Sequence, residues 1–137
     1  MRKKRSPFLR ILILAILIKD GSTHGYALYK RILYHTRMKW KPSIGTIYRT
    51  LNEMVKEGLI LKHIENRKRS YTVTPKGLDY FIKNSKAPLT KMAGVLATAL
   101  EAYLKISSIN PDMPSLLTKD LKERLKNLKK VLQKYDS

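Results

Sequence analysis

The sequence predicts a mainly α-helical (α+β) fold in which helices carry one small β-hairpin. Apolar residues recur at helical spacing through most of the chain, and two short segments in its middle alternate as strands do. Glycine, proline or a capping hydroxyl stands at most of the junctions between these segments. A length of 137 residues allows one compact domain with an extension.

The first helix is expected over residues 8–19 and the second from about Ser22 to Thr36. The first is apolar almost all round, which is typical of a central helix, and Asp20-Gly21 ends it. Ser22 and Thr23 offer hydroxyl groups that could cap the second helix, whose apolar spacing is set by Tyr26, Tyr29, Ile32 and Leu33. The two tyrosines could instead stack on bases, but their spacing favours core packing.

A third helix is expected from Ser43, its N-cap, to about Glu57, where Gly58 ends it. Its inner face would carry Ile44, Ile47, Leu51, Met54 and Val55, and its opposite face Gly45, Thr46, Arg49, Glu53 and Lys56. A small and basic face near the helix start could enter a DNA major groove and bring Arg49 to a base edge or a phosphate. A merely solvated face has the same pattern. Trp40, just before this helix, either packs under it or lines an effector pocket.

Residues 59–64 and 70–74 are expected to pair as a two-stranded hairpin. Its tip, Glu65–Arg69, contains three consecutive cations that repel one another and that a polyanion would stabilise, although a solvated loop is the alternative. Three helices, a hairpin and a further helix in this order indicate a winged helix-turn-helix. In that fold the third helix reads the major groove and the β wing contacts the flanking backbone or minor groove.

Thr74-Pro75 starts the fourth helix, which is expected to end near Asn84 and to turn Leu78, Phe81 and Ile82 inward. A proline at position 88 then suggests a boundary, with a winged-helix domain over 8–86 and C-terminal dimerisation helices within 87–137. These helices, over 88–106 and 115–135, need a partner to bury their apolar faces, most simply a second copy of the chain. The expected dimer contacts are Leu89, Met92, Leu96, Leu100, Tyr103, Leu117, Leu121, Leu125, Leu128 and Leu132.

The charge of the chain favours a nucleic-acid partner. Lysine and arginine number 29 against 10 acidic residues, a formal net charge of +19. Most of this excess lies in residues 1–86, and it includes a basic N-terminal arm over 1–7 that would lie on DNA through Arg2, Lys3, Lys4 and Arg5. The arm and the apolar run behind it imitate an export signal, but residues 11–18 are too few to span a bilayer. We therefore expect a cytoplasmic protein that does not enter a membrane.

The residues needed for catalysis or metal binding do not occur at useful spacing. The chain has no cysteine, and His24, His35 and His63 stand far apart without nearby carboxylates at ligand spacing. Neither a nucleophile motif nor a glycine-rich phosphate loop is present in the sequence. We expect no enzyme activity, no metal and no cofactor.

Five stretches of the sequence together match a known family pattern: residues 12–17, 24–28, 42–51, 57–60 and 69–77. In these stretches the chain resembles the PadR family of transcriptional regulators, over about residues 8–84. The resemblance implies a dimeric, sequence-specific repressor whose C-terminal helices dimerise. By matching position, Ser43, Thr46, Tyr48 and Arg49 would face DNA, and Arg67, Lys68 and Arg69 would form the wing tip. No family motif is recognised after residue 86, so an effector is left unknown.

The sequence thus favours a homodimeric transcriptional regulator, most simply a repressor, that binds a pseudo-palindromic operator in double-stranded DNA. An architectural or nucleoid-type protein that coats DNA with low sequence specificity is the alternative, and the charge of +19 supports it as well. A protein-binding adaptor is a third class, which the cations of the wing and the arm disfavour. The ratio of specific to nonspecific affinity for DNA separates the first two.

Overall fold

The computed structural model describes residues 7–36, 42–112 and 117–136. Arg2, Lys3, Lys4 and Arg5 of the expected basic arm, and Trp40, lie outside these residues. The chain divides into two compact units, Met1–Leu89 and Thr90–Ser137. Its elements in chain order are α1 (Pro7–Asp20), β1 (Thr23–His24), α2 (Gly25–His35), α3 (Ile44–Lys56), β2 (Ile60–Glu65), β3 (Lys68–Val73), α4 (Pro75–Ile109) and α5 (Lys119–Asp136).

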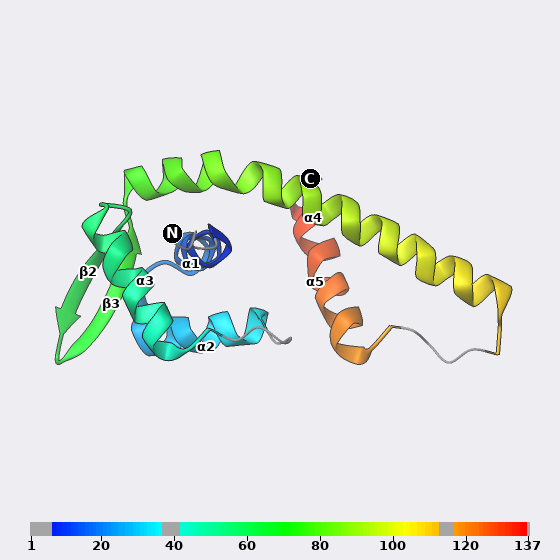
Figure 1. Cartoon of the computed structure of the whole chain (residues 1–137), viewed down its shortest axis with the longest axis horizontal. Helices are drawn as coiled ribbons and strands as arrows, with labels where there is room; N and C mark the ends of the chain where they lie inside the picture. Colours follow the sequence, from blue (N-terminus) through cyan, green and yellow to red (C-terminus); the bar gives the residue numbers. More distant parts are fainter. Residues whose placement is uncertain (1–6, 37–41, 113–116, 137) are drawn as a thin grey trace, which may run out of the picture. The chain divides into compact units, whose positions relative to one another are not determined.

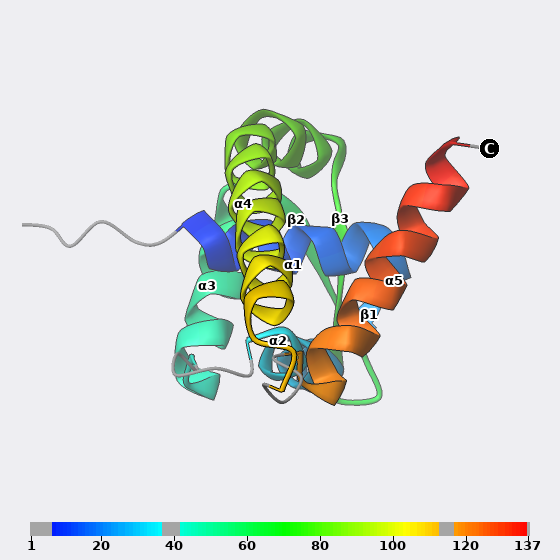
Figure 2. The same cartoon turned by 90° about the vertical axis from the view of Figure 1, so that its right-hand side faces the viewer.

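Helix α1 is the centre of the first unit, as its sequence predicts. Figures 1 and 2 both show it between α2 on one side and the first part of α4 on the other. Apolar residues of α1, α2, α3, β2 and β3 form one buried cluster. The members of this cluster are Leu9, Ile13, Leu14, Ile16, Leu17, Leu28, Ile32, Ile47, Leu51, Met54, Leu59, Ile60 and Tyr71.

The sheet differs from the expected two-stranded wing by one short strand. Its order is β1-β3-β2, with all neighbours antiparallel, and β1 pairs Thr23 with Tyr71 and His24 with Ser70. The expected capping of α2 by Ser22 or Thr23 is therefore wrong. Thr23 is a buried strand residue whose hydroxyl donates to the carbonyl of Gly21 at 2.9 Å, and the N-cap of α2 is His24, without a side-chain hydrogen bond.

The tip of the wing is also tighter than expected. Glu65 pairs with Lys68, so only Asn66 and Arg67 form the turn, and Lys68 and Arg69 belong to β3. Both turn residues have positive φ, 50° and 65°, which is the pattern of a type I′ turn. Such a turn has two central residues because its backbone twist matches that of the paired strands.

Helix α3 begins and ends as its sequence predicts. The Ser43 side chain accepts a hydrogen bond from the backbone N–H of Thr46 at 3.1 Å, and Gly58 adopts a positive φ of 79° just after the helix. Ile47, Leu51 and Met54 are buried on the inner face. Ile44, expected on that face, is 44% exposed because it lies in the first turn, beyond the edge of the core.

Helix α4 does not end near Asn84. It continues without interruption through Pro88 to Ile109, so it starts in the first unit and ends in the second. Its first turn is fixed by close approach, because a Cβ atom at Gly77 would collide with the carbonyl of Leu59. This contact turns Gly77, Tyr80, Phe81 and Ser85 inward. Leu78 and Ile82, expected to be buried, are exposed.

The second unit contains the rest of α4 and α5, and none of its described residues is buried. Helix α5 begins at Lys119, after Leu117. Of the residues expected at a dimer interface, Leu96, Leu100, Leu117, Leu121 and Leu125 are half-buried in the single chain, and Leu89, Met92, Tyr103, Leu128 and Leu132 are exposed. By length and composition alone α4 could also cross a membrane, a test that core helices of soluble proteins pass as well.

Candidate nucleic-acid interface

One exposed stripe of α3 carries small, polar and basic residues. Gly45, Arg49, Asn52 and Lys56 follow one another at intervals of three or four residues and are all exposed. Lys56 lies about 10 Å further along the helix axis than Arg49, given the rise of about 1.5 Å per residue, so the two cations reach different parts of a ligand. Asn52 was not among the predicted site residues, although its spacing of three from Arg49 could have identified it.

Ser43 and Thr46, both expected to face DNA, are joined to each other at the start of this helix. Their hydroxyl oxygens are 2.9 Å apart, in addition to the capping bond from the Thr46 N–H. Ser43 is exposed and Thr46 is half-buried. Their first effect is therefore to fix the start of α3, and a ligand would meet hydroxyls whose orientation is already set.

Tyr48 does not share the exposed stripe with Arg49. It is half-buried against the core, and its ring lies over the start of α2, where a Cβ atom at Gly25 would be 2.9 Å from the Tyr48 hydroxyl. Glycine at position 25 thus allows the close approach of the two helices. The structure places Tyr48 between α3, α2 and the wing rather than on the face that Arg49 presents.

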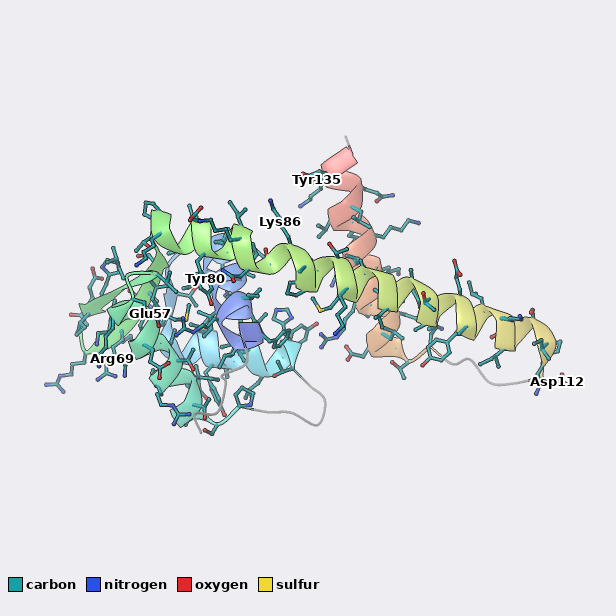
Figure 3. The ribbon with its side chains drawn as sticks, turned by 45° about the horizontal axis from the view of Figure 1, so that its top comes forward. Glu57, Arg69, Tyr80, Lys86, Asp112 and Tyr135 are labelled. Atoms are coloured by element: carbon teal, nitrogen blue, oxygen red, sulfur yellow. The ribbon has the colours of Figure 1, made fainter. Side chains whose placement is uncertain are left out.

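The cations of the wing are exposed and lack carboxylate partners. Arg67, Lys68 and Arg69 form no ion pair with any residue that the structure describes, although Glu65 stands opposite Lys68 in the hairpin. Arg67 occupies the left-handed backbone region, which is unfavourable for a residue with a side chain. Figure 3 shows Arg69 on the wing.

A cluster of ion pairs at the surface holds the other end of α3. The Arg10 guanidinium of α1 donates to both carboxylate oxygens of Glu57 and lies 3.7 Å from a carboxylate oxygen of Glu53. Lys76 of α4 donates to the Glu57 carbonyl at 2.9 Å. The hydrogen bond to Glu57 raises the pKa of Arg10 further, against the opposing effect of burial, and Tyr80 of α4 contributes in the same direction. Figure 3 shows Glu57 and Tyr80 in this region.

The charged residues thus fall into two groups, those paired between helices and those that face solvent. Carboxylates pair with arginines that connect helices, whereas the cations of the outer stripe and the wing face solvent. Within the described ranges, no group of three histidine, aspartate or glutamate side chains could hold a metal ion. The arrangement is suited to binding an extended polyanion.

Known proteins are similar to this chain in sequence and in fold. The model of the transcriptional regulator PadR-like family matches residues 13–83. The chain is 33% identical over 125 residues to the transcriptional regulator YqjI of Escherichia coli (strain K12), which covers 90% of this chain and 55% of that protein. The chain thus spans about half the length of this curated relative.

Solved structures of other proteins have a similar fold. A transcriptional regulator from Clostridium thermocellum superimposes with a TM-score of 0.54 at 28% identity, over 63% of this chain and 88% of that chain. The winged-helix DNA-binding protein F93 from STIV gives a TM-score of 0.51 at 20% identity, over 58% of this chain and 86% of that chain, a likeness of fold. The fold is a winged helix-turn-helix, and the chain belongs to the transcriptional regulator PadR-like family.

Proposed function

We propose that this chain is a sequence-specific, DNA-binding transcriptional regulator without enzyme activity that works in the cytoplasm. The observation that carries this proposal is the exposed stripe of Arg49, Asn52 and Lys56 on α3, beside a wing whose cations lack partners among the described residues. Arginine pairs well with guanine and asparagine with adenine in the major groove. Membership of a family of transcriptional regulators supports the same function.

The division of contacts follows from the two kinds of surface. Arg49 and Asn52, in the middle of a helix narrow enough for the major groove, would contact base edges, with Gly45 leaving room for the DNA and Ser43 and Thr46 at its start. Lys56, the wing cations and the N-terminal arm would contact phosphates, which position the protein but carry no sequence information. Tyr48 would contact the backbone beside the wing.

We further propose that the regulator is a homodimer and most simply a repressor. The second unit exposes apolar residues along α4 and α5, and a second copy of the chain would cover them. A two-fold symmetric protein binds a pseudo-palindromic operator whose half-sites are centred about one helical turn apart, or a multiple of it.

Selection of DNA fragments by the purified full chain tests this proposal. At about 150 mM salt, near physiological ionic strength, we expect a two-fold symmetric motif to be enriched, with an affinity typically ~10³-fold or more above random sequence. A library that emerges without enrichment while the protein binds all DNA would instead support an architectural protein. Absence of binding even at low salt would contradict DNA binding altogether.

Two variants test the division of contacts. Arg49→Ala should cost roughly 1–3 kcal/mol of operator binding and relax specificity at one position in each half-site. Lys68→Ala should weaken operator and random DNA about equally, with a shallower dependence of affinity on salt. If Arg49→Ala weakens both kinds of DNA equally, Arg49 contacts a phosphate.

A further inference from the structure

An open pocket lies between the wing and the start of α2. Its volume is about 680 Å³, and its walls come from three elements: the first turns of α2, the wing residues Arg67–Arg69, and Tyr48 of α3. All of these residues belong to the first unit. The short pairing of β1 with β3 creates this arrangement, because it ties the residue before α2 directly to the strand that carries Lys68 and Arg69.

The charge in the pocket is of one sign. Lys30, Arg67, Lys68 and Arg69 line it, and no carboxylate does. None of these four cations forms an ion pair with another described residue. Like charges gathered in one pocket repel each other, so an anionic guest would lower the free energy of the site.

The start of α2 adds a second source of positive potential. The first backbone N–H groups of a helix lack partners within the helix, and the N-cap residue His24 makes no side-chain hydrogen bond to them. Gly25, Tyr26 and Ala27 of this first turn line the pocket. Anions bind favourably at such helix starts because the N–H groups and the helix dipole both favour negative charge.

Tyr26 holds one of the cations in place. Sequence spacing suggested that Tyr26 packs in the core, but its side chain is 58% exposed at the pocket. The Lys30 ammonium nitrogen lies over its ring, 5.3 Å from the centroid, and the Tyr29 ring lies behind it at 6.2 Å between centroids. A cation over a tyrosine ring is attracted by the ring electrons, so Tyr26 orients Lys30.

We propose that this pocket binds a phosphate group of the DNA backbone, held by Lys30, by the wing residues Lys68 and Arg69, and by the first N–H groups of α2. The proposal rests on the proposed DNA-binding function and adds α2 to the helix and the wing that carry it. Tyr26 is a positioning residue for Lys30. The guest is a DNA phosphate rather than a free anion because Tyr48 and the wing border the opening. A backbone strand that runs from α3 to the wing therefore passes over it.

The test measures binding of the full chain to a mixed-sequence duplex between about 50 and 200 mM salt, the range in which phosphate contacts change affinity most clearly. Lys30→Ala should weaken binding about ten-fold per protomer, as for one charge-assisted contact, and make the slope of log affinity against log salt shallower by about 0.9 per protomer. Lys83→Ala is the matched control, because Lys83 is an exposed lysine of the same unit that pairs with Asp79 at 3.2 Å. It should change neither quantity.

Variants of Tyr26 test the positioning of Lys30. Tyr26→Phe keeps the ring under Lys30 and should retain the affinity and slope of the natural chain, whereas Tyr26→Ala should lose a several-fold part of the affinity. Thermal unfolding of each variant shows whether it is folded. A folded Lys30→Ala variant with unchanged affinity and slope would overturn the pocket while leaving DNA binding by the natural chain intact.

Two further outcomes are distinct. Inorganic phosphate, titrated at constant ionic strength and followed by ³¹P NMR, should bind weakly and compete with the duplex. Phosphate binding that Lys30→Ala abolishes without any change in DNA affinity would identify a free-anion site and overturn the proposal. Absence of duplex binding by the natural chain at low salt would overturn the proposed function, and the pocket proposal with it.

Discussion

The two units of this chain handle apolar surface in opposite ways. The first unit hides its large aliphatic residues in one cluster around α1 and exposes cations on α3 and the wing. The second unit has no buried residue in its described part, and Val95, Leu104, Ile109, Val131 and Leu132 are all more than half exposed. Residues 1–89 carry 20 basic and 5 acidic side chains, and residues 90–137 carry 9 and 5.

This difference indicates separate tasks. A unit with a complete core is stable by itself and can present charge to a ligand, whereas exposed apolar residues at helical spacing are stabilised only when another surface covers them. We infer that the first unit binds DNA and that the second unit holds two copies of the chain together. Four predictions test or refine this comparison, from the largest expected effect to the smallest.

Removal of residues 90–137 should have the largest effect. The fragment 1–89 contains the whole buried cluster and should unfold cooperatively, but as a monomer. Its affinity for the operator should fall by about a hundred-fold or more, because two linked half-sites no longer bind together. Light scattering and DNA binding measure the two quantities. A fragment that stays dimeric would place the interface in the first unit and contradict the assignment of dimerisation to the second unit.

Truncation of one leucine in each unit should separate core from assembly. Leu51→Ala removes a fully buried side chain and should cost about 2–5 kcal/mol of unfolding free energy in the isolated fragment 1–89 or the full chain. Leu132→Ala, at a position that is 56% exposed in the single chain, should instead raise the dissociation constant of the dimer. Denaturation at several protein concentrations distinguishes them, since only the second effect depends on concentration. Equal, concentration-independent losses would contradict the prediction.

Removal of an ion pair should lower the unfolding free energy less than removal of a buried leucine, and by different amounts in the two units. Arg10→Ala breaks the contact of α1 with Glu57 and Glu53 at the end of α3, and should cost about 1 kcal/mol because the Arg10 side chain is only 17% exposed. Arg124→Ala breaks a local pair with Asp120 within α5 and should cost about 0.3–0.5 kcal/mol. Chemical denaturation measures both. A larger loss for Arg124 would show that α5 depends on this pair more than a surface helix should.

Tyr71→Phe should change stability least at neutral pH. Its hydroxyl is buried without a partner among the described residues, so its removal should shift the unfolding free energy by less than about 1 kcal/mol, in the stabilising direction. Burial raises the Tyr71 pKa above the ordinary value of 10.0. The stability that comes from keeping Tyr71 protonated in the folded state is therefore fully present below pH 10, and it is lost as the pH rises through the folded-state pKa. Thermal unfolding from pH 7 to 11 should therefore show a smaller alkaline loss for Tyr71→Phe. An unchanged alkaline limb would assign that loss to other groups.

The sequence by itself determined the features that local chemistry controls. Ser43 capped α3 as predicted because a hydroxyl three residues before an N–H is a local arrangement, and Gly58 took the positive φ that ends this helix. The apolar stripe Ile47, Leu51 and Met54 faced the core, since periodicity alone sets it. The order of three helices, a hairpin and a further helix followed from these signals, and with it the winged helix-turn-helix.

Only the tertiary structure decided the features that depend on distant residues. Strand β1 has two residues, too few for any pattern, and exists because β3 offers it a free edge. Tyr26 shares the helical spacing of core residues, yet its side chain is exposed and lines the pocket beside the wing. Helix α4 continues through Pro88, which a local rule reads as a break, because the loss of one backbone hydrogen bond does not outweigh the helical residues on both sides. The pocket beside the wing combines residues of α2, α3 and the wing, so no single stretch of sequence could have indicated it.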